Sequence, residues 1–199
     1  KANQTRTRGE SVFYLNDFES GWEGWYGEDG TIPTDMWHLS DVAPYGNNGY
    51  SWWMSDPAIG GYRSNRYNVL DTPAIMVTSG NSTLKFKINY AVESPAVHEG
   101  YDGWDGVNIR IFTVGESNSW SVIEGLPAYN CRSMWSFGEI HGEGLNVPGW
   151  GGTSNGWVDA TFNLNAYVGK EVIIRFAFAS DLAYDTQNEE GLFGVKIDN

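Results

Sequence analysis

The sequence predicts an all-β fold, a single antiparallel β-sandwich of jelly-roll type with one long glycine-rich loop segment. Stretches that alternate apolar and polar residues with period two are separated by clusters of Gly, Asn, Pro and Ser. Only 116–126 and 164–170 are candidates for helix, and the first is better explained as a strand edge and a turn. Many short strands at this spacing are typical of one sandwich or jelly roll.

Strands are expected, in chain order, at 11–18, 82–92, 106–114, 157–164, 171–180 and 192–199. The clearest alternation is in the second stretch, where Phe86, Ile88 and Tyr90 share one face and the lysines and asparagine between them share the other. This pattern is typical of a half-buried strand. The stretch 171–180 is apolar on both faces for part of its length, which predicts a central strand.

We divide the chain into a flexible N-terminal arm, residues 1–12, and the sandwich domain, residues 13–199. The arm begins KANQTRTRGE, which is polar and holds three of the twelve basic residues, whereas the chain as a whole is acidic. The segment 126–156 is rich in glycine and predicts a long loop. Loops of this length are uncommon in compact domains and are usually functional or disordered.

Composition and charge exclude several classes of function. The 199 residues include 25 acidic and 12 basic side chains, and the resulting charge of −13 repels phosphate backbones and attracts divalent cations. We therefore expect no nucleic-acid partner. No run of about 18 apolar residues occurs, so we expect no membrane insertion. Cys131 is the only cysteine, which rules out an internal disulfide.

The order of several short phrases carries a family resemblance. The phrases are NDFESGWEGW (16–25), YSWWMSD (50–56), STLKFKINYAVE (82–93), YDGWDGVNIRI (101–111), GWVDATFNLNAYVGKEVIIRFAFASD (156–181) and EEGLFGVKIDN (189–199). Together they resemble the MAM-like jelly-roll domain found beside immune-inhibitor-A-type metallopeptidases. They are also similar to the cleaved-adhesin and choice-of-anchor J domains of bacterial surface adhesins. The resemblance covers residues 14–199.

The resemblance implies a secreted or cell-surface protein with a structural calcium site built from the first and last strands. On this chain it places Asp17, Glu19 and Asp198 around one Ca²⁺ ion. Three converging carboxylates would repel one another, and a hard cation with oxygen ligands would remove that repulsion. The alternative is that all three are solvated carboxylates at strand edges. Because the chain starts at Lys1 without an initiator Met, we also expect a piece of a longer precursor.

Two further acidic stretches are candidates for metal binding. Asp181, Asp185 and Glu190 lie in the loop before the last strand, where they would add ligands to the same ion or hold a second one. The alternative for this stretch is a solvated loop. Asp102 and Asp105 form a weaker candidate, because their spacing is not that of an EF-hand loop.

The ten tryptophans exceed what one core is expected to hold, so some are expected at the surface. Trp52 and Trp53 are adjacent on an expected strand, so one of them points outward or into a second packed layer. Trp135 and Trp150, in the glycine-rich segment, are the best candidates for surface aromatics. We predict that these four bind a ligand, since exposed tryptophan stacks on sugars or anchors protein interfaces. The alternative is that they pack in the core and loops.

No catalytic motif stands out in the sequence. The zinc-protease pattern H-E-x-x-H is absent, and the three histidines are far apart. We therefore expect no enzyme. We predict instead a calcium-binding extracellular domain that works by adhesion or self-assembly, with further copies of itself or another surface protein as partner. The alternative is a carbohydrate-binding or accessory module of a secreted hydrolase, with polysaccharide as the partner.

Overall fold

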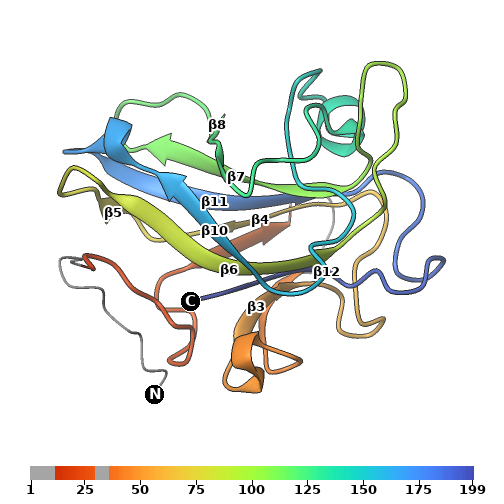
Figure 1. The fold of residues 1–199 in the computed structure, drawn as a ribbon, viewed down its shortest axis with the longest axis horizontal. Helices are drawn as coiled ribbons and strands as arrows, with labels where there is room; N and C mark the ends of the chain where they lie inside the picture. The colour runs from red at the N-terminus through yellow and green to blue at the C-terminus, as the bar shows by residue number, and fades with distance from the viewer. Residues whose placement is uncertain (1–11, 30–35) are drawn as a thin grey trace.

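Two antiparallel sheets packed face to face form the fold of this chain (Figure 1). The computed structural model describes residues 12–29 and 36–199, so the predicted arm lies almost wholly outside the described part. Sheet A has the order β1-β4-β11-β7-β8, with β5 beside β11, and sheet B has the order β2-β3-β12-β6-β10-β9. The predicted all-β sandwich is therefore confirmed.

The two sheets draw their strands from the whole length of the described chain. Sheet A consists of β1 (Tyr26–Asp29), β4 (Tyr67–Asp71), β5 (Ile75–Met76), β7 (Gly106–Thr113), β8 (Ser121–Val122) and β11 (Glu171–Ala179). Sheet B consists of β2 (Trp37–Ser40), β3 (Ser51–Met54), β6 (Thr83–Ala91), β9 (Gly125–Leu126), β10 (Val158–Asn163) and β12 (Gly194–Asp198). The helical turns are η1 (Tyr45–Asn47), η2 (Ser136–Ile140) and η3 (Asn165–Tyr167). None of the helices in the described ranges has the length and apolar character needed to cross a membrane.

The alternation predicted for β6 is confirmed. Phe86, Ile88 and Tyr90 are buried between the sheets, whereas Lys85 and Lys87 lie on the outer face. Cross-strand pairing fixes the register, because a slip of one residue would turn the apolar set toward solvent. The core between the sheets is built in the same way from the inward faces of β3, β4, β7, β10, β11 and β12.

The prediction that 171–180 forms a central strand is also confirmed, because β11 pairs with both β4 and β7. Phe176 and Phe178 point into the core. Ala177 and Ala179, on the opposite face, are buried as well. The second layer that covers them comes from the glycine-rich segment.

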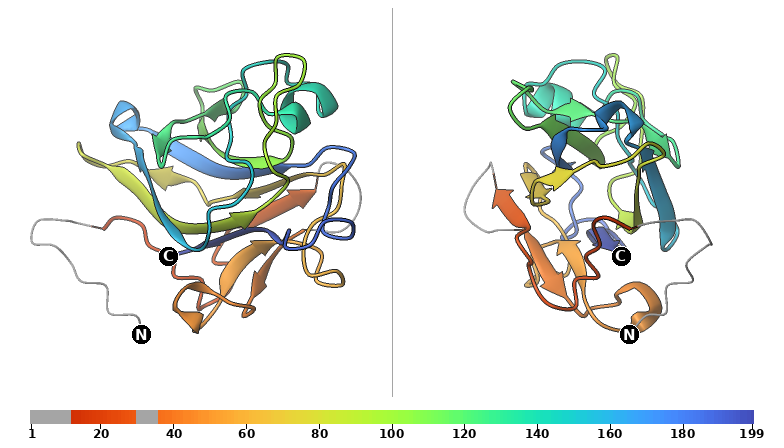
Figure 2. Two further views of the ribbon diagram at one scale, coloured as in Figure 1. Left: turned by 45° about the vertical axis from the view of Figure 1, so that its right-hand side comes forward. Right: turned by 90° about the vertical axis from the view of Figure 1, so that its left-hand side faces the viewer.

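The segment 126–156 is a packed layer rather than a loose loop. A second cluster of buried side chains joins it to the outer face of sheet A, and its buried members are Val69, Cys131, Met134, Phe137, Val147, Ala177 and Ala179. Bridges Gly103↔Met134 and Val107↔Trp150 attach it to the chain around the start of β7. In Figure 2 this segment rises over one end of β7 and β11. Glycine has no Cβ atom, so backbone segments pack closely here. A glycine-rich sequence alone does not distinguish such close packing from a flexible loop.

The start of the domain departs from the prediction. Residues 12–18 form no strand, and Phe18 has a positive φ of 61°, so the chain turns where an extended strand was expected. The first strand, β1, pairs with β4 in sheet A, whereas the last strand, β12, lies between β3 and β6 in sheet B. The first and last strands are therefore not neighbours. Residues 13–16 and 197–199 nevertheless line one cavity of about 110 Å³ at the edge of the core.

Candidate metal centre

Three buried carboxylates meet at one end of the sandwich. Glu93 follows β6, Asp105 directly precedes β7, and Asp181 follows β11. Because Ala179 of β11 pairs with Gly106 of β7, the end of one strand lies beside the start of the other. Strand β6 brings Glu93 to the same place from sheet B. The antiparallel topology alone therefore gathers carboxylates that are far apart in sequence.

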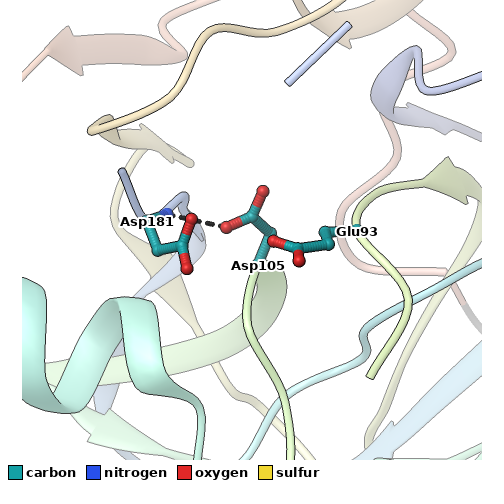
Figure 3. Close-up of side chains that lie close together, drawn as sticks. All are labelled: Glu93, Asp105 and Asp181. Atoms are coloured by element: carbon teal, nitrogen blue, oxygen red, sulfur yellow. Dashed lines mark hydrogen bonds between the residues drawn. The ribbon is translucent and has the colours of Figure 1, made fainter. Parts of the chain in front are cut away.

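The three side chains point toward one another (Figure 3). Their ligand oxygens all lie within 4.8 Å of one another. The exposed fraction is 7% for Glu93, 0% for Asp105 and 8% for Asp181. Carboxylates at such burial are rare unless a charged partner compensates them, because removing a charge from water is costly.

Backbone amides and one phenol hold the cluster in place. Asp181 donates its backbone N–H to Oδ1 of Asp105 at 2.7 Å, as the dashed line in Figure 3 marks. The hydroxyl of Tyr62 donates to Oδ2 of Asp105 at 2.8 Å and accepts the backbone N–H of Glu93 at 3.0 Å. Tyr62 is fully buried and thus connects two of the three acids. Oε2 of Glu93 has no hydrogen-bond partner and is the orphaned atom of the site.

The glycine-rich segment also fixes the position of two of the acids. Gly152 donates its backbone N–H to the carbonyl of Glu93 at 3.0 Å. Gly106 follows Asp105, and a Cβ atom there would lie 2.6 Å from the carbonyl oxygen of Trp150. The close approach requires glycine at this position. The segment 150–152 therefore holds Glu93 and Asp105 at a fixed separation.

The electrostatics of the cluster favour a bound cation. Burial raises the pKa of Glu93 to about 8, with further contributions from the negative charges of Asp181 and Glu189. Burial also raises the pKa of Asp105 well above its usual range and raises that of Asp181. Burial and the Asp105 carboxylate raise the pKa of Tyr62, which keeps this phenol a hydrogen-bond donor. Each shift reports a site that disfavours uncompensated negative charge.

The donor set indicates which ion fits. All three side chains offer oxygen, and neither histidine nor cysteine belongs to the group. Hard divalent cations take such ligands, whereas zinc sites use nitrogen and sulfur more often. Ca²⁺ accepts six to eight oxygens in flexible geometry, so carbonyls and water would complete its shell. Mg²⁺ requires stricter octahedral geometry and retains more water, which fits a dry pocket of carboxylates less well.

We expect the stability of the metal-free protein to fall as the pH rises from 5 to 8. Glu93 has a folded-state pKa of about 8, above its usual value, so its favourable contribution is full below pH 4.5 and is lost as the pH rises through 8. His38 and His141, whose pKa values burial lowers, change stability in the opposite direction. Urea unfolding in EDTA at each pH, measured on the wild type and on Glu93→Gln, isolates the contribution of the Glu93 carboxyl group. An equal fall in stability in the wild type and in Glu93→Gln would contradict the assignment of the pH dependence to Glu93.

The carboxylates predicted from the two ends lie in a different place. Asp198 is buried, and its Oδ2 accepts the backbone N–H of Tyr45 at 3.0 Å. Burial, together with the charges of Glu19 and Asp17, raises the pKa of Asp198 to about 6. Asp17 and Glu19 are exposed, and Glu19 Oε1 accepts the backbone N–H of Tyr50 at 3.0 Å. The three acids lie near enough to influence one another, and an ion among them stays a prediction.

The loop before the last strand divides its acids between two roles. Asp181 belongs to the buried cluster. Asp185 is buried too, but its oxygens accept the backbone N–H groups of Ser64 at 3.0 Å and Gln187 at 2.9 Å, which anchors the loop. Glu190 is exposed. Among these three predicted ligands, the structure thus brings only Asp181 into the cluster.

Most of the predicted ligand-binding tryptophans are buried. Trp52 is 0% exposed in the core, and Trp53 points outward from sheet B but is 5% exposed, with Nε1 donating to the carbonyl of Phe193 at 2.7 Å. The expectation of a surface aromatic is wrong for Trp150, which is 1% exposed and packs against Tyr90 and Phe162.

Trp135 differs from the other three because it is partly exposed. Its ring contacts those of His98 at 5.1 Å, Tyr101 at 5.0 Å and Trp104 at 5.9 Å between centroids. His98, Tyr101 and Trp104 lie in the loop that leads to Asp105, and Trp135 lies in the segment 126–156. A ligand role for Trp135 stays a prediction.

Glu93 is the member of the buried cluster that sequence reasoning missed. It stands at the end of the phrase STLKFKINYAVE, one residue after the expected strand 82–92. Asp105 precedes the strand expected at 106–114, and Asp181 follows the one at 171–180. Ends and starts of antiparallel strands meet at one edge of a sandwich, so the position of acids relative to strand boundaries was the usable signal.

Comparisons with known proteins give structural neighbours and no family. No family model and no curated protein matches the chain. Among solved structures, the K3 cleaved adhesin domain of Lys-gingipain from Porphyromonas gingivalis is similar, with 16% identity, a TM-score of 0.44 and 92% of each chain covered. TmCBM61 in complex with β-1,4-galactotriose is similar at 14% identity and a TM-score of 0.44, covering 94% of this chain and 95% of that one. The carbohydrate-binding module TmCBM27, described for specific mannan recognition, is similar at 14% identity and a TM-score of 0.37, covering 92% and 91%.

Proposed function

We propose that this chain is a calcium-binding, non-catalytic extracellular domain that works by adhesion. The observation that carries the proposal is the buried cluster of Glu93, Asp105 and Asp181, with its orphaned glutamate oxygen. A cation there converts a mutual repulsion into a cross-link between the loop ends of both sheets. The proposed role of the ion is structural, since it joins three chain segments whose carboxylates repel one another without it.

An extracellular setting supports calcium as the natural ion. Calcium sites of extracellular modules work at dissociation constants of about 10⁻⁴–10⁻³ M, which sites with few protein ligands reach. The formal charge of −13 adds a general attraction for divalent cations. Binding calcium would also reduce repulsion between two copies of so acidic a domain.

Exposed apolar residues at the start of the described chain support an adhesive contact. Val12, Phe13, Tyr14 and Leu15 are consecutive in sequence and are 47%, 41%, 36% and 53% exposed. A continuous apolar stretch on the surface favours contact with another surface. The proposed partner is a further copy of this chain or another surface protein.

Melting measured with light scattering tests the proposal. Relative to EDTA, calcium at 100 times its dissociation constant is expected to add about 2.7 kcal/mol, or roughly 5–10 °C for a domain of this size. Magnesium at the same concentration should add less. A rise in scattering together with melting temperature supports calcium-dependent self-assembly, whereas monomeric scattering points to another surface protein. Melting that ignores calcium would refute the calcium site.

A further inference from the structure

The two sheets present outer faces of opposite character. On sheet A, Val69, Ala177 and Ala179 are buried beneath the segment 126–156. On sheet B, the outer face of β6 and β10 carries polar side chains that solvent reaches, as the exposure of Lys85 and Asp159 shows. These two strands cross the front of Figure 1. The open face is therefore the place on the described part of the sandwich to look for a ligand surface.

A row of side chains along β10 forms the main line of this face. Residues two apart on a strand share a face, so Asp159, Thr161 and Asn163 of β10 point the same way, and Trp157, directly before the strand, continues the row. Asp159 lies opposite Lys87 of β6, and Thr161 lies opposite Lys85. At about 3.3 Å per residue, the row is on the order of 20 Å long. That length suits an extended chain of several units rather than a small molecule.

An aromatic pair stands at one end of the row. The rings of Tyr45 and Trp157 meet edge to face, with centroids 6.0 Å apart at 77°. Tyr45 is 40% exposed, and Trp157 is partly exposed. Lys87 Nζ lies 4.6 Å from the Tyr45 ring centroid and 2.6 Å from Oδ1 of Asp159. The backbone N–H of Tyr45 is held by Asp198 at 3.0 Å, so these contacts fix the pair before any ligand arrives.

An open hollow of about 310 Å³ lies at the other end of the row. Its lining has polar and apolar parts and comes from β9 with the residue before it, β10 and the start of β6: Thr83, Glu124, Gly125, Leu126, Thr161, Phe162 and Asn163. Hydroxyl, amide and carboxylate groups here both donate and accept hydrogen bonds. The face therefore combines aromatic rings at one end with a hollow of mixed polar and apolar lining at the other.

We propose that this outer face, from Tyr45 and Trp157 to Thr161 and Asn163, binds a neutral polysaccharide chain. Sugar rings offer C–H surfaces to aromatic rings and hydroxyls to closely spaced donors and acceptors. Lys87 and Asp159 form an ion pair across the face, so their charges offset each other there. The charge of −13 on the chain would repel anionic polymers. The proposal goes beyond the proposed function, since it adds a carbohydrate ligand to the protein partner proposed above.

Affinity electrophoresis of the full chain tests this proposal. The gels would contain β-1,4-galactan, galactomannan, xylan, mixed-linkage β-glucan or dextran, with alginate as the anionic polymer. We expect retardation by at least one neutral polysaccharide and none by alginate. Tyr45→Ala and Trp157→Ala should each weaken binding roughly tenfold, as the loss of an aromatic contact implies. Asp159→Ala should also weaken binding. The Asp159 side chain is 78% exposed, so this substitution carries little risk to folding.

The matched control is Trp120→Ala on the opposite sheet. Trp120 is partly exposed and stacks on Arg175 at 3.8 Å. This variant should bind polysaccharide like the wild type. All variants should keep the calcium-induced rise in melting temperature, which separates the two proposals. A wild type that responds to calcium but binds no neutral polysaccharide overturns this inference alone. An equal loss of polysaccharide binding in Trp120→Ala and Trp157→Ala would also overturn this inference.

Discussion

Asp105→Asn is expected to remove the calcium response of this protein. Asp105 is fully buried and lies between Glu93 and Asp181, so the substitution deletes the central charge of the cluster without changing its shape. We expect calcium affinity to fall roughly 100-fold, because affinity at such sites follows the number of charged ligands. Titration calorimetry on metal-free protein measures the loss directly.

The same substitution should have the opposite effect in EDTA. Without a cation, Asp105 must either carry a buried charge or take up a proton, and both cost free energy. Asparagine is neutral and does not have this cost. Asp105→Asn should therefore be as stable as the wild type in EDTA, or more stable, and clearly less stable in calcium. Glu190→Gln is the matched control, since Glu190 is exposed in a neighbouring loop. A calcium response that Asp105→Asn keeps would refute the cluster as the site.

Trp150→Ala is expected to cost about 3–5 kcal/mol of unfolding free energy, the range for removing a large buried aromatic. Trp150 is 1% exposed and packs against Tyr90, Tyr129 and Phe162. Its Nε1 lies 3.2 Å from the carbonyls of Pro127 and Ala128, so the change also removes a donor. Urea unfolding in calcium measures the loss.

Trp135→Ala supplies the comparison for that measurement. Trp135 is partly exposed, so its removal should cost only about 1–2 kcal/mol. Equal costs for the two substitutions would contradict the layered arrangement of the segment 126–156. A ligand whose affinity drops with Trp150→Ala in a protein of unchanged stability would restore the surface role predicted from sequence.

The strands were predictable where one face of the strand is exposed to solvent and the other is buried. Phe86, Ile88 and Tyr90 alternate with polar residues, and β6 follows that pattern nearly to its ends. The stretch 12–18 has similar β-forming residues but forms no strand. Its Asn16 accepts the backbone N–H of Phe18 at 2.7 Å and turns the chain. A local side-chain hydrogen bond thus outweighed the propensity of the stretch.

The buried cluster was only partly predictable. Asp181 was proposed as a ligand, and Asp105 was considered only beside Asp102, because spacing along the chain was the criterion. The cluster is instead made by topology, since it requires β6 and β11 to end and β7 to begin at the same edge. Spacing along the chain does not reveal a site whose ligands come from three strands.

The tryptophans show why residue type alone does not locate a binding surface. The second layer over sheet A takes up aromatic side chains that a single core would exclude, and Trp150 lies at its junction with the main core. Trp157 adjoins the open face of sheet B, and its partner there is Tyr45 from a separate loop. Which aromatics reach solvent depends on where the glycine-rich segment packs.

Anomalous scattering from crystals grown with calcium tests the central claim most directly. A long-wavelength difference map is expected to show a peak at about 2.3–2.6 Å from carboxylate oxygens of Glu93, Asp105 and Asp181, the usual range for calcium ligands. Such a peak would show that the ion cross-links the strand ends of both sheets. No peak at that cluster, or a single peak beside Asp17, Glu19 and Asp198 instead, would contradict the account.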